Sequence, residues 1–447
     1  MKTLQASSSH SLPPSPARRP VSWLTSACAG LLLALAVVAC GGGGSVASVG
    51  SGGTGTVGAY NVGTVTGFGS VFVNGVRFDD TGASVNDEDG SRSLSDLRLG
   101  MVVRVQGSVN ASGSATASSF AFDSELLGPV RSINTGSKTL VILGQTVAVD
   151  ANTVFDASLP SGFSSLQVAQ PVEVHGYLNP SASTLQATFI ELKSNPNRYK
   201  LSGTVNNLQG ASKTFQIGQE TINFNGVSAS DIPSGVANGQ LIKVRLTPSA
   251  PGTGGALQAG SLRSGNSNLP GNTERVEIEG LVSAVASTTQ FSVSGALVDA
   301  RNASFTNGSA GLVVGARVEV KGSVVAGTLV ATQVKVKQSS SNSGSNGSGG
   351  SGGSSSSGSS GSSSGGSSSS TGNVPDVKEI ELKGPLSNVN TSAKTLVVRG
   401  VLVSYAGSVV YENGTQANLT NTTQVQVKGQ TAIDSSLVQA IRIKFDN

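Results

Sequence analysis

The side chains best suited to chemistry in this sequence are acidic and lie in one short segment. Residues 86–90 have the sequence Asn-Asp-Glu-Asp-Gly, which places three carboxylates before a glycine. Hard cations such as Ca²⁺ favour clustered oxygen ligands at a tight turn, so Asp87 and Asp89 are candidate calcium ligands. The distal glutamate of a complete calcium loop is missing at the required spacing. We therefore favour an acidic, solvated hairpin tip and predict no metal site.

The remaining ionisable candidates do not predict catalysis. Asp79 and Asp80 are adjacent, and adjacent strand residues point to opposite faces, so their carboxylates cannot easily converge on a substrate. His175 follows Val174 in an apparent strand and faces water if Val174 faces the core. No Gly-x-Ser-x-Gly elbow at a strand-to-helix turn accompanies this histidine. We predict a turn at the two aspartates, a surface histidine, no catalytic residue, no cofactor and no enzyme activity.

Aromatic rings gather near the start of the repeated part of the chain. Phe68, Phe72 and Phe78 are candidate ligand-binding residues, because exposed rings stack on bases or sugars. A small all-β core also uses such rings, and we favour that interpretation. Charged residues make up only 12% of the sequence, and the formal charge of +4 falls close to neutral once residues 1–39 are removed. A nearly neutral body lacks the basic footprint of a nucleic-acid binder.

The N-terminal segment has the parts of a secretory signal peptide: positive charge, then an apolar run. The run is shorter than the ~20 residues that a membrane-spanning helix needs. The residues that end it, Val37-Val38-Ala39-Cys40, resemble a bacterial lipobox, the sequence recognised by lipoprotein signal peptidase. The resemblance implies that Val37, Val38 and Ala39 are recognised by the peptidase and that Cys40 is acylated, which anchors the chain in membrane lipid. An ordinary secretory signal is the alternative.

Internal repeats are the strongest signal in the body of the chain. Five segments open with Gly-x-Val or Gly-x-Leu, at Gly63, Gly128, Gly203, Gly280 and Gly384. Four of them share a later Val-x-Val-x-Gly motif, at Val103–Gly107, Val172–Gly176, Val318–Gly322 and Val425–Gly429. The third repeat departs from this motif and has Lys243-Val244-Arg245-Leu246-Thr247 instead.

Alternation within these motifs predicts strands with one buried face. Val318, Val320 and Val334 would point inward, while Glu319, Lys321 and Lys335 would face water. Five short strands in each ~65-residue repeat predict an all-β chain of tandem small five-stranded barrels, similar to oligonucleotide/oligosaccharide-binding (OB) barrels, joined by Gly/Ser-rich linkers. A sandwich of two sheets is the alternative. We expect one helical turn each at Leu94–Leu99 and Phe163–Ala169. Because so small a barrel is marginally stable, we expect neighbouring modules to pack together.

The predicted organisation follows from these repeats and from composition. The segments are a signal peptide at 1–39, a lipidated Gly-rich tether at 40–60, module 1 at 61–125, module 2 at 126–194, module 3 at 198–263, module 4 at 275–337, a Ser/Gly linker at 338–373 and module 5 at 376–447. The linker cannot bury a core and is predicted to be disordered.

The repeat motifs resemble an uncharacterised bacterial domain-of-unknown-function family that occurs in tandem in envelope lipoproteins. The resemblance covers residues 61–337 and 379–446 and brings no catalytic residues. It implies a lipid-anchored protein of the cell envelope, and Gly41 after Cys40 resembles the outer-membrane sorting pattern. We expect a non-catalytic structural or interaction role, with membrane lipid, an envelope protein or polysaccharide as partners and no nucleic acid. The alternative is a ligand-binding protein for polysaccharide or a small molecule, using the barrel faces.

Overall fold

The computed structural model describes residues 56–179, 184–233, 235–248, 255–265, 269–306, 308–337, 378–431 and 437–446, and these are all-β. Their helical content is four single 3-10 turns: η1 (Leu94–Asp96), η2 (Gly162–Ser165), η3 (Ala229–Asp231) and η4 (Gln416–Asn418). None of the helices in these ranges has the length and apolarity to span a membrane. The predicted signal peptide, Cys40 with Val37, Val38 and Ala39, and the linker 338–373 lie outside the described residues.

The strand pairings of module 1 form a closed ring. Its strands are β1 (Val57–Gly67), β2 (Val71–Val73), β3 (Val76–Asp79), β4 (Ser84–Asp87), β5 (Gly90–Arg92), β6 (Val102–Val109) and β7 (Ala115–Phe122). β1 pairs with β2 and β6, β2 pairs with β3, β3 runs parallel to β7, and β7 pairs with β6. The β4–β5 hairpin is attached outside the ring, because β4 runs parallel to β7.

The same order of pairing recurs in modules 2, 4 and 5. In module 3 the first strand is divided into two, of which β14 pairs with β18 and β15 pairs with β16. Module 2 has β8 (Leu126–Asn134), β9 (Thr139–Ile142), β10 (Gln145–Ala148), β11 (Val154–Phe155), β12 (Pro171–Asn179) and β13 (Thr184–Leu192). Module 3 has β14 (Tyr199–Thr204), β15 (Asn206–Gln209), β16 (Thr214–Ile217), β17 (Glu220–Asn223), β18 (Leu241–Leu246) and β19 (Leu257–Ser264). Module 4 has β20 (Thr273–Ser287), β21 (Gln290–Val293), β22 (Ala296–Asp299), β23 (Ser304–Phe305), β24 (Arg317–Val325) and β25 (Thr328–Lys337). Module 5 has β26 (Lys378–Asn390), β27 (Thr395–Val398), β28 (Val401–Ser404), β29 (Val410–Glu412), β30 (Gln424–Thr431) and β31 (Leu437–Phe445).

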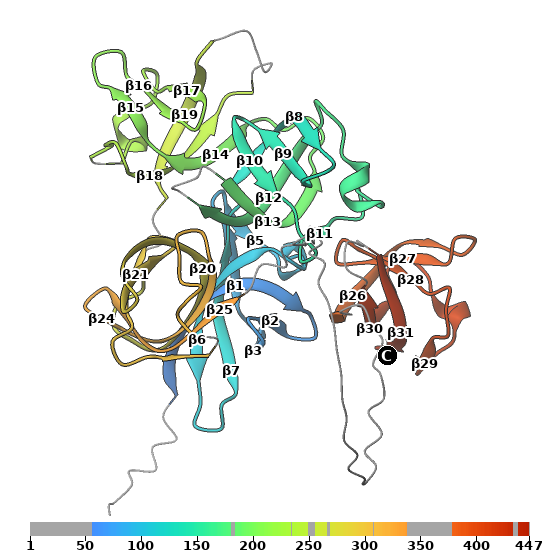
Figure 1. Ribbon diagram of the computed structural model, residues 1–447. Helices are drawn as coiled ribbons and strands as arrows, with labels where there is room; N and C mark the ends of the chain where they lie inside the picture. Colours follow the sequence, from blue (N-terminus) through green and yellow to red (C-terminus); the bar gives the residue numbers. More distant parts are fainter. Residues whose placement is uncertain are drawn as a thin grey trace, which may run out of the picture. The chain divides into compact units, whose positions relative to one another are not determined.

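Alternation along these strands builds the cores. Val318, Val320 and Val334 are fully buried in module 4, as predicted, and Figure 1 shows its strands curving around that interior. Lys335 is exposed, whereas Glu319 and Lys321 are half-buried and ion-paired with each other. The turn η1 lies within the predicted helical stretch Leu94–Leu99, and η2 begins one residue before the second predicted stretch, Phe163–Ala169, and overlaps its start.

A steric constraint explains why the last position of the Val-x-Val-x-Gly motif is glycine. In modules 1, 2, 4 and 5 the register of the last ladder shifts at this glycine, which marks a β-bulge. A Cβ at Gly107, Gly176 or Gly322 would lie 2.1 Å from a backbone carbonyl oxygen of the neighbouring strand. The repeat therefore keeps glycine where the last two strands approach too closely for any side chain.

Ladders also join neighbouring modules, as expected from their small cores. β1 of module 1 runs parallel to β20 of module 4, with Ala59–Val62 opposite Arg275–Ile278. β8 of module 2 pairs with β14 of module 3 through Leu126 opposite Leu201. Strands that would otherwise be exposed at these places gain hydrogen-bonded partners.

One carboxyl group on the β1–β20 ladder is placed where its ionisation opposes folding. Glu277 is 8% exposed and lies opposite Asn61 of β1, and Lys321 Nζ is 3.3 Å from its Oε2. Burial, aided by the Glu319 carboxylate, raises the pKa of Glu277 to about 7 from 4.5, against the effect of Lys321. The folded protein thus holds this proton more tightly than the unfolded chain. Stability from this group is complete below pH 4.5 and is lost as the pH rises through 7.

We expect Glu277→Gln to raise the free energy of unfolding by about 1–2 kcal/mol at pH 8 and to leave it nearly unchanged at pH 5. Urea unfolding of the wild type and the variant at both pH values measures this difference. The exposed Glu274 on the same strand supplies the control variant Glu274→Gln. An equal gain at pH 5 and pH 8 would contradict the assignment.

Candidate functional site

The acidic segment at residues 86–90 forms the turn of the β4–β5 hairpin. Asp87 pairs with Gly90, so Glu88 and Asp89 are the turn residues. Gly90 has a φ of 136°, which side-chain-bearing residues rarely adopt. The Asp89 backbone N–H donates a hydrogen bond to Asp87 Oδ1 at 2.7 Å, an Asx turn that closes the tip. The predicted hairpin is present.

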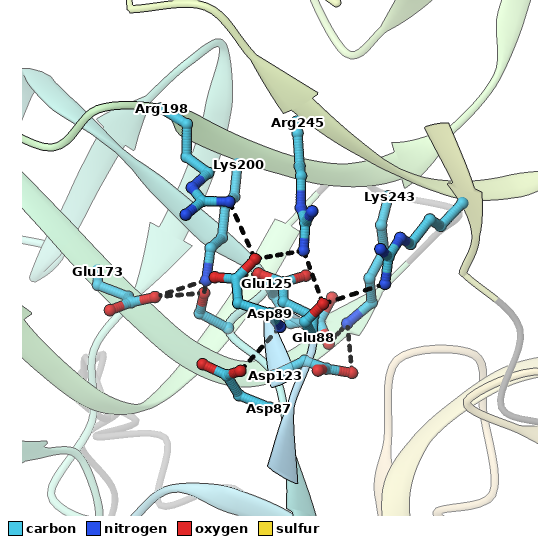
Figure 2. A network of polar contacts seen from close by, with 12 residues as sticks. Asp87, Glu88, Asp89, Asp123, Glu125, Glu173, Arg198, Lys200, Lys243 and Arg245 are labelled. Carbon is cyan, nitrogen blue, oxygen red and sulfur yellow. Dashed lines mark hydrogen bonds and ion pairs between the residues drawn. The ribbon is translucent and has the colours of Figure 1, made fainter. Parts of the chain in front are cut away.

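The predicted solvation of this tip is wrong. The side chains of Asp87, Glu88 and Asp89 are only 12%, 9% and 18% exposed. The Asp89 Oδ1 atom lies 2.9 Å from Arg198 Nη1 and 2.5 Å from Arg245 Nη2. Figure 2 shows Arg198, Lys200 and Arg245 of module 3 converging on the tip, while Lys243 of the same module reaches Asp123 and Glu125.

Module 3 supplies these cations through ordinary strand alternation. Along β18, Ile242, Val244 and Leu246 are buried in the core of module 3. Lys243 and Arg245 therefore project from the opposite face, which the hairpin of module 1 covers. Periodicity assigns a residue to a face of its own module, and it says nothing about a second module that packs on that face.

Lys200 on β14 links three modules. Its Nζ lies 2.5 Å from Glu88 Oε1 of module 1 and 2.9 Å from Glu173 Oε1 of module 2, and it donates to Ser124 Oγ at 2.8 Å. Burial alone would lower the pKa of Lys200, but the carboxylates of Glu173 and Glu88 outweigh that effect and raise it. The ammonium group stays charged because both acidic neighbours are held against it.

A second group of ion pairs extends the junction along the connection between modules 1 and 2. Lys243 Nζ lies 2.9 Å from Glu125 Oε1, and Arg104 Nη2 lies 2.9 Å from Asp123 Oδ2. Burial would raise the pKa of Asp123, but Lys243 and Arg104 together lower it. These paired charges tie the modules together.

The candidate calcium ligands Asp87 and Asp89 do lie close together, but each forms ion pairs with arginine side chains. Arg92 Nε lies 2.6 Å from Asp87 Oδ2, and Asp89 is held by the guanidinium groups of Arg198 and Arg245. The charges that a calcium ion would neutralise are neutralised by the chain itself.

The predicted surface position of His175 is also wrong. The residue is 2% exposed, and its ring lies 6.3 Å from the ring of Phe122 and 5.8 Å from the ring of Phe189, centroid to centroid. Val172 and Val174 do face the core of module 2, as expected. The outer face of β12 is buried as well, because Phe122 of module 1 lies against it. Burial lowers the pKa of His175 to about 4, so the imidazole is neutral at pH 7.

His175 shares this outer face with two glutamates. Glu173 lies two residues earlier on β12, and the register of β12 and β13 places Glu191 directly opposite Glu173. One potential ligand atom from each of the three lies within 4.8 Å of the others, and no other such group occurs in the described ranges. Lys193 Nζ lies 3.0 Å from Glu173 Oε2 and 2.9 Å from Glu191 Oε1. The group lines a cavity of 390 Å³ that extends to Asp89 and Lys200.

The other predicted residues belong to the fold of module 1. Phe68 and Phe78 are buried in its core, as favoured, and Phe72 is half-buried. Asp79 Oδ1 accepts a hydrogen bond from the Thr81 backbone N–H at 3.0 Å, which confirms the predicted turn.

Sequence comparison places the repeats in one family. The family model described as a domain of unknown function (DUF5666) matches residues 44–119, 128–191, 279–335 and 383–444. Module 3, which lacks the Val-x-Val-x-Gly motif, lies outside the matched ranges. No curated protein matches the chain. Because the four matches together cover more than half of its length, this chain belongs to the DUF5666 family.

Proposed function

We propose that this chain is a lipid-anchored protein of the bacterial cell envelope that acts as a non-catalytic interaction scaffold. Acylated Cys40 would hold it at the outer membrane, and the modules would present binding faces to an envelope protein or polysaccharide. The lipobox-like residues 37–40 and the nearly neutral body support this assignment.

We further propose that each module is an OB-like barrel. The strand order supports this, because the first strand pairs with the second and fourth while the third runs parallel to the fifth. Such a ring is the arrangement of a small Greek-key barrel, whereas a two-sheet sandwich would leave open edges.

The observation that carries the scaffold proposal is the ion-pair junction around Lys200. It joins side chains of modules 1, 2 and 3 through partly buried contacts. A fixed spacing between module faces lets several weak contacts add up to useful avidity, because the second contact becomes intramolecular.

Ligand binding is the second candidate function, and one cavity favours it. A space of 620 Å³ is lined by polar residues of modules 1, 2 and 4, among them Asn74, Gln186, Thr188, Glu279 and Arg317. Asn74 Oδ1, Gln186 Nε2 and Thr188 Oγ1 have no hydrogen-bond partner in the described structure. Convergent polar groups of this kind can orient a sugar or another small polar molecule.

We expect Cys40→Ser to move nearly all of the protein from the membrane fraction to the soluble fraction and to abolish its labelling by a fatty-acid analogue. The reason is that several acyl chains on one residue anchor durably, at ~0.8 kcal/mol for each buried methylene. Cys28→Ser, which changes the other cysteine, is the control and should stay in the membrane fraction. Unchanged fractionation of Cys40→Ser would contradict the anchoring.

In-cell crosslinking of a C-terminally tagged chain, followed by mass spectrometry, tests the scaffold role. One recurring stoichiometric protein partner is the expected result. A retained glycan or small molecule without a protein would favour the second candidate. Recovery of the chain alone would count against both.

A further inference from the structure

One ladder position of module 2 differs chemically from its equivalents. In the last ladder, Glu319 of module 4 lies opposite Lys335, and Gln426 of module 5 lies opposite Lys444. In module 2 the same position pairs Glu173 with Glu191. Like charges directly opposite one another destabilise a sheet, so this pair requires a cation.

Two residues further along the strand, module 2 carries the histidine. The equivalent positions hold Gln106, Lys321 and Lys428 in modules 1, 4 and 5. His175 Nδ1 is buried and has no hydrogen-bond partner in the described structure. An unpartnered ring nitrogen inside a protein loses the hydrogen bonds that it made in water. A ligand that accepts its lone pair would remove that cost.

The Glu173 carboxylate is held in one orientation by contacts to its Oε1 atom. Glu173 Oε1 accepts a hydrogen bond from Ser124 Oγ at 2.6 Å and lies 2.9 Å from Lys200 Nζ. Contacts of this kind fix the direction of a metal-binding carboxylate. The other oxygen, Oε2, faces Lys193.

The ammonium group of Lys193 lies between the two carboxylates, where a metal ion would bind, but little holds its side chain there. Its side chain is 37% exposed, and both of its ion pairs are with the two facing glutamates. A lysine at the edge of a cavity can turn its ammonium group into water without breaking the fold.

We propose that Glu173, His175 and Glu191 form a binding site for a divalent transition-metal ion, with zinc as the preferred ion, and that Lys193 competes with the metal for the two carboxylates. Imidazole nitrogen and carboxylate oxygen are both ordinary zinc ligands, and imidazole also suits the neighbouring transition metals. Donors bound at about 2.0–2.2 Å around a tetrahedral ion lie about 3.4 Å apart. The three donor atoms, within 4.8 Å of one another, need only small side-chain movements to reach that spacing.

Calorimetric titration of the full chain, purified in detergent and stripped with EDTA, tests this site with Zn²⁺ as the probe. We expect saturable zinc binding, and we expect Glu191→Gln and His175→Gln each to weaken it by at least about tenfold. Changes of residues that only hydrogen-bond to a metal ligand already reduce metal affinity by that factor. Lys193→Met should bind zinc more tightly than the wild type, because it removes the competing cation. Co²⁺ should give visible absorption bands of a tetrahedral site in Lys193→Met.

Lys321→Met is the matched control. Lys321 bridges Glu277 and Glu319 of module 4, each at 3.3 Å, but no histidine accompanies that pair. The zinc affinity of Lys321→Met should equal that of the wild type. Glu191→Gln keeps the proposal testable if His175→Gln fails to fold, because it relieves the like-charge pair. Zinc binding that neither ligand variant weakens, or that Lys193→Met does not strengthen, would overturn the assignment.

Discussion

Replacing Lys200 by methionine is expected to lower the free energy of unfolding by about 3 kcal/mol, because it removes one partner of a buried ion pair. Glu88 would lose its ion pair while its side chain remains 9% exposed, whereas Glu173, 10% exposed at the side chain, would keep Lys193 at 3.0 Å from its Oε2. An uncompensated carboxylate in such a place costs far more than the original pair contributes. Urea unfolding followed by circular dichroism measures the change.

The double variant Lys200→Met, Glu88→Gln separates loss of the pair from general damage. Part of the loss should be recovered, because the second change removes the carboxylate left without its cation. Lys213→Met changes an exposed lysine of the same module and should alter stability by no more than about 0.5 kcal/mol. A small effect of Lys200→Met, or additive effects of the two changes, would mean that the junction does not hold the modules together.

Much of the fold could be predicted from period-two alternation. Val318, Val320 and Val334 are buried because a strand in a small module has one face against its own core. The departure of Lys243–Thr247 from the repeat motif was visible in the sequence, and the family model also fails to match module 3. The core position of Phe68 and Phe78 follows from a different argument, that a small all-β core uses large aromatic rings.

The junction could not be predicted in this way. The inward position of Val174 predicts a water-facing His175, and that inference holds only for a module without neighbours. The three acids of the hairpin tip at Asp87–Asp89, without the distal glutamate of a calcium loop, predict a solvated turn, which also assumes that no second module covers it. The sequence held a signal for the buried tip alone: module 3 places Arg245 on the outer face of a strand, where it can pair with an acidic tip. This charge complementarity predicts a contact only when it is known that module 3 packs against module 1.

The pairing of Glu173 with Glu191 was hidden for a different reason. Strand boundaries derived from a motif are uncertain by a residue or two, and a shift of one residue reverses every facing pair. The bulge at Gly176 adds such a shift within the ladder itself. Only the observed register places the two glutamates opposite each other beside His175.

The bulge glycines carry the second large effect, and Gly322 in module 4 tests it. A Cβ at this position would lie 2.1 Å from the Val330 carbonyl oxygen and 2.9 Å from the Ala331 Cα. Both contacts are with backbone of the paired strand β25, which cannot move aside as a flexible side chain could. Gly322→Ala should therefore separate β24 from β25 locally and lower the free energy of unfolding by about 3 kcal/mol.

Hydrogen exchange provides the sharper measurement for this variant. Amides of β24 and β25 should lose protection in Gly322→Ala, while those of β12 and β13 in module 2 keep theirs, because each module has its own ladder at this position. Gly271→Ala is the control, since a Cβ there meets no atom within 4 Å. Equal stability of the two variants would show that the glycine of the repeat motif is not kept for steric reasons. The expected contrast would explain why four repeats of this chain share this glycine: the bulge lets the fourth strand bend towards the fifth, and that approach is what leaves no room for a side chain.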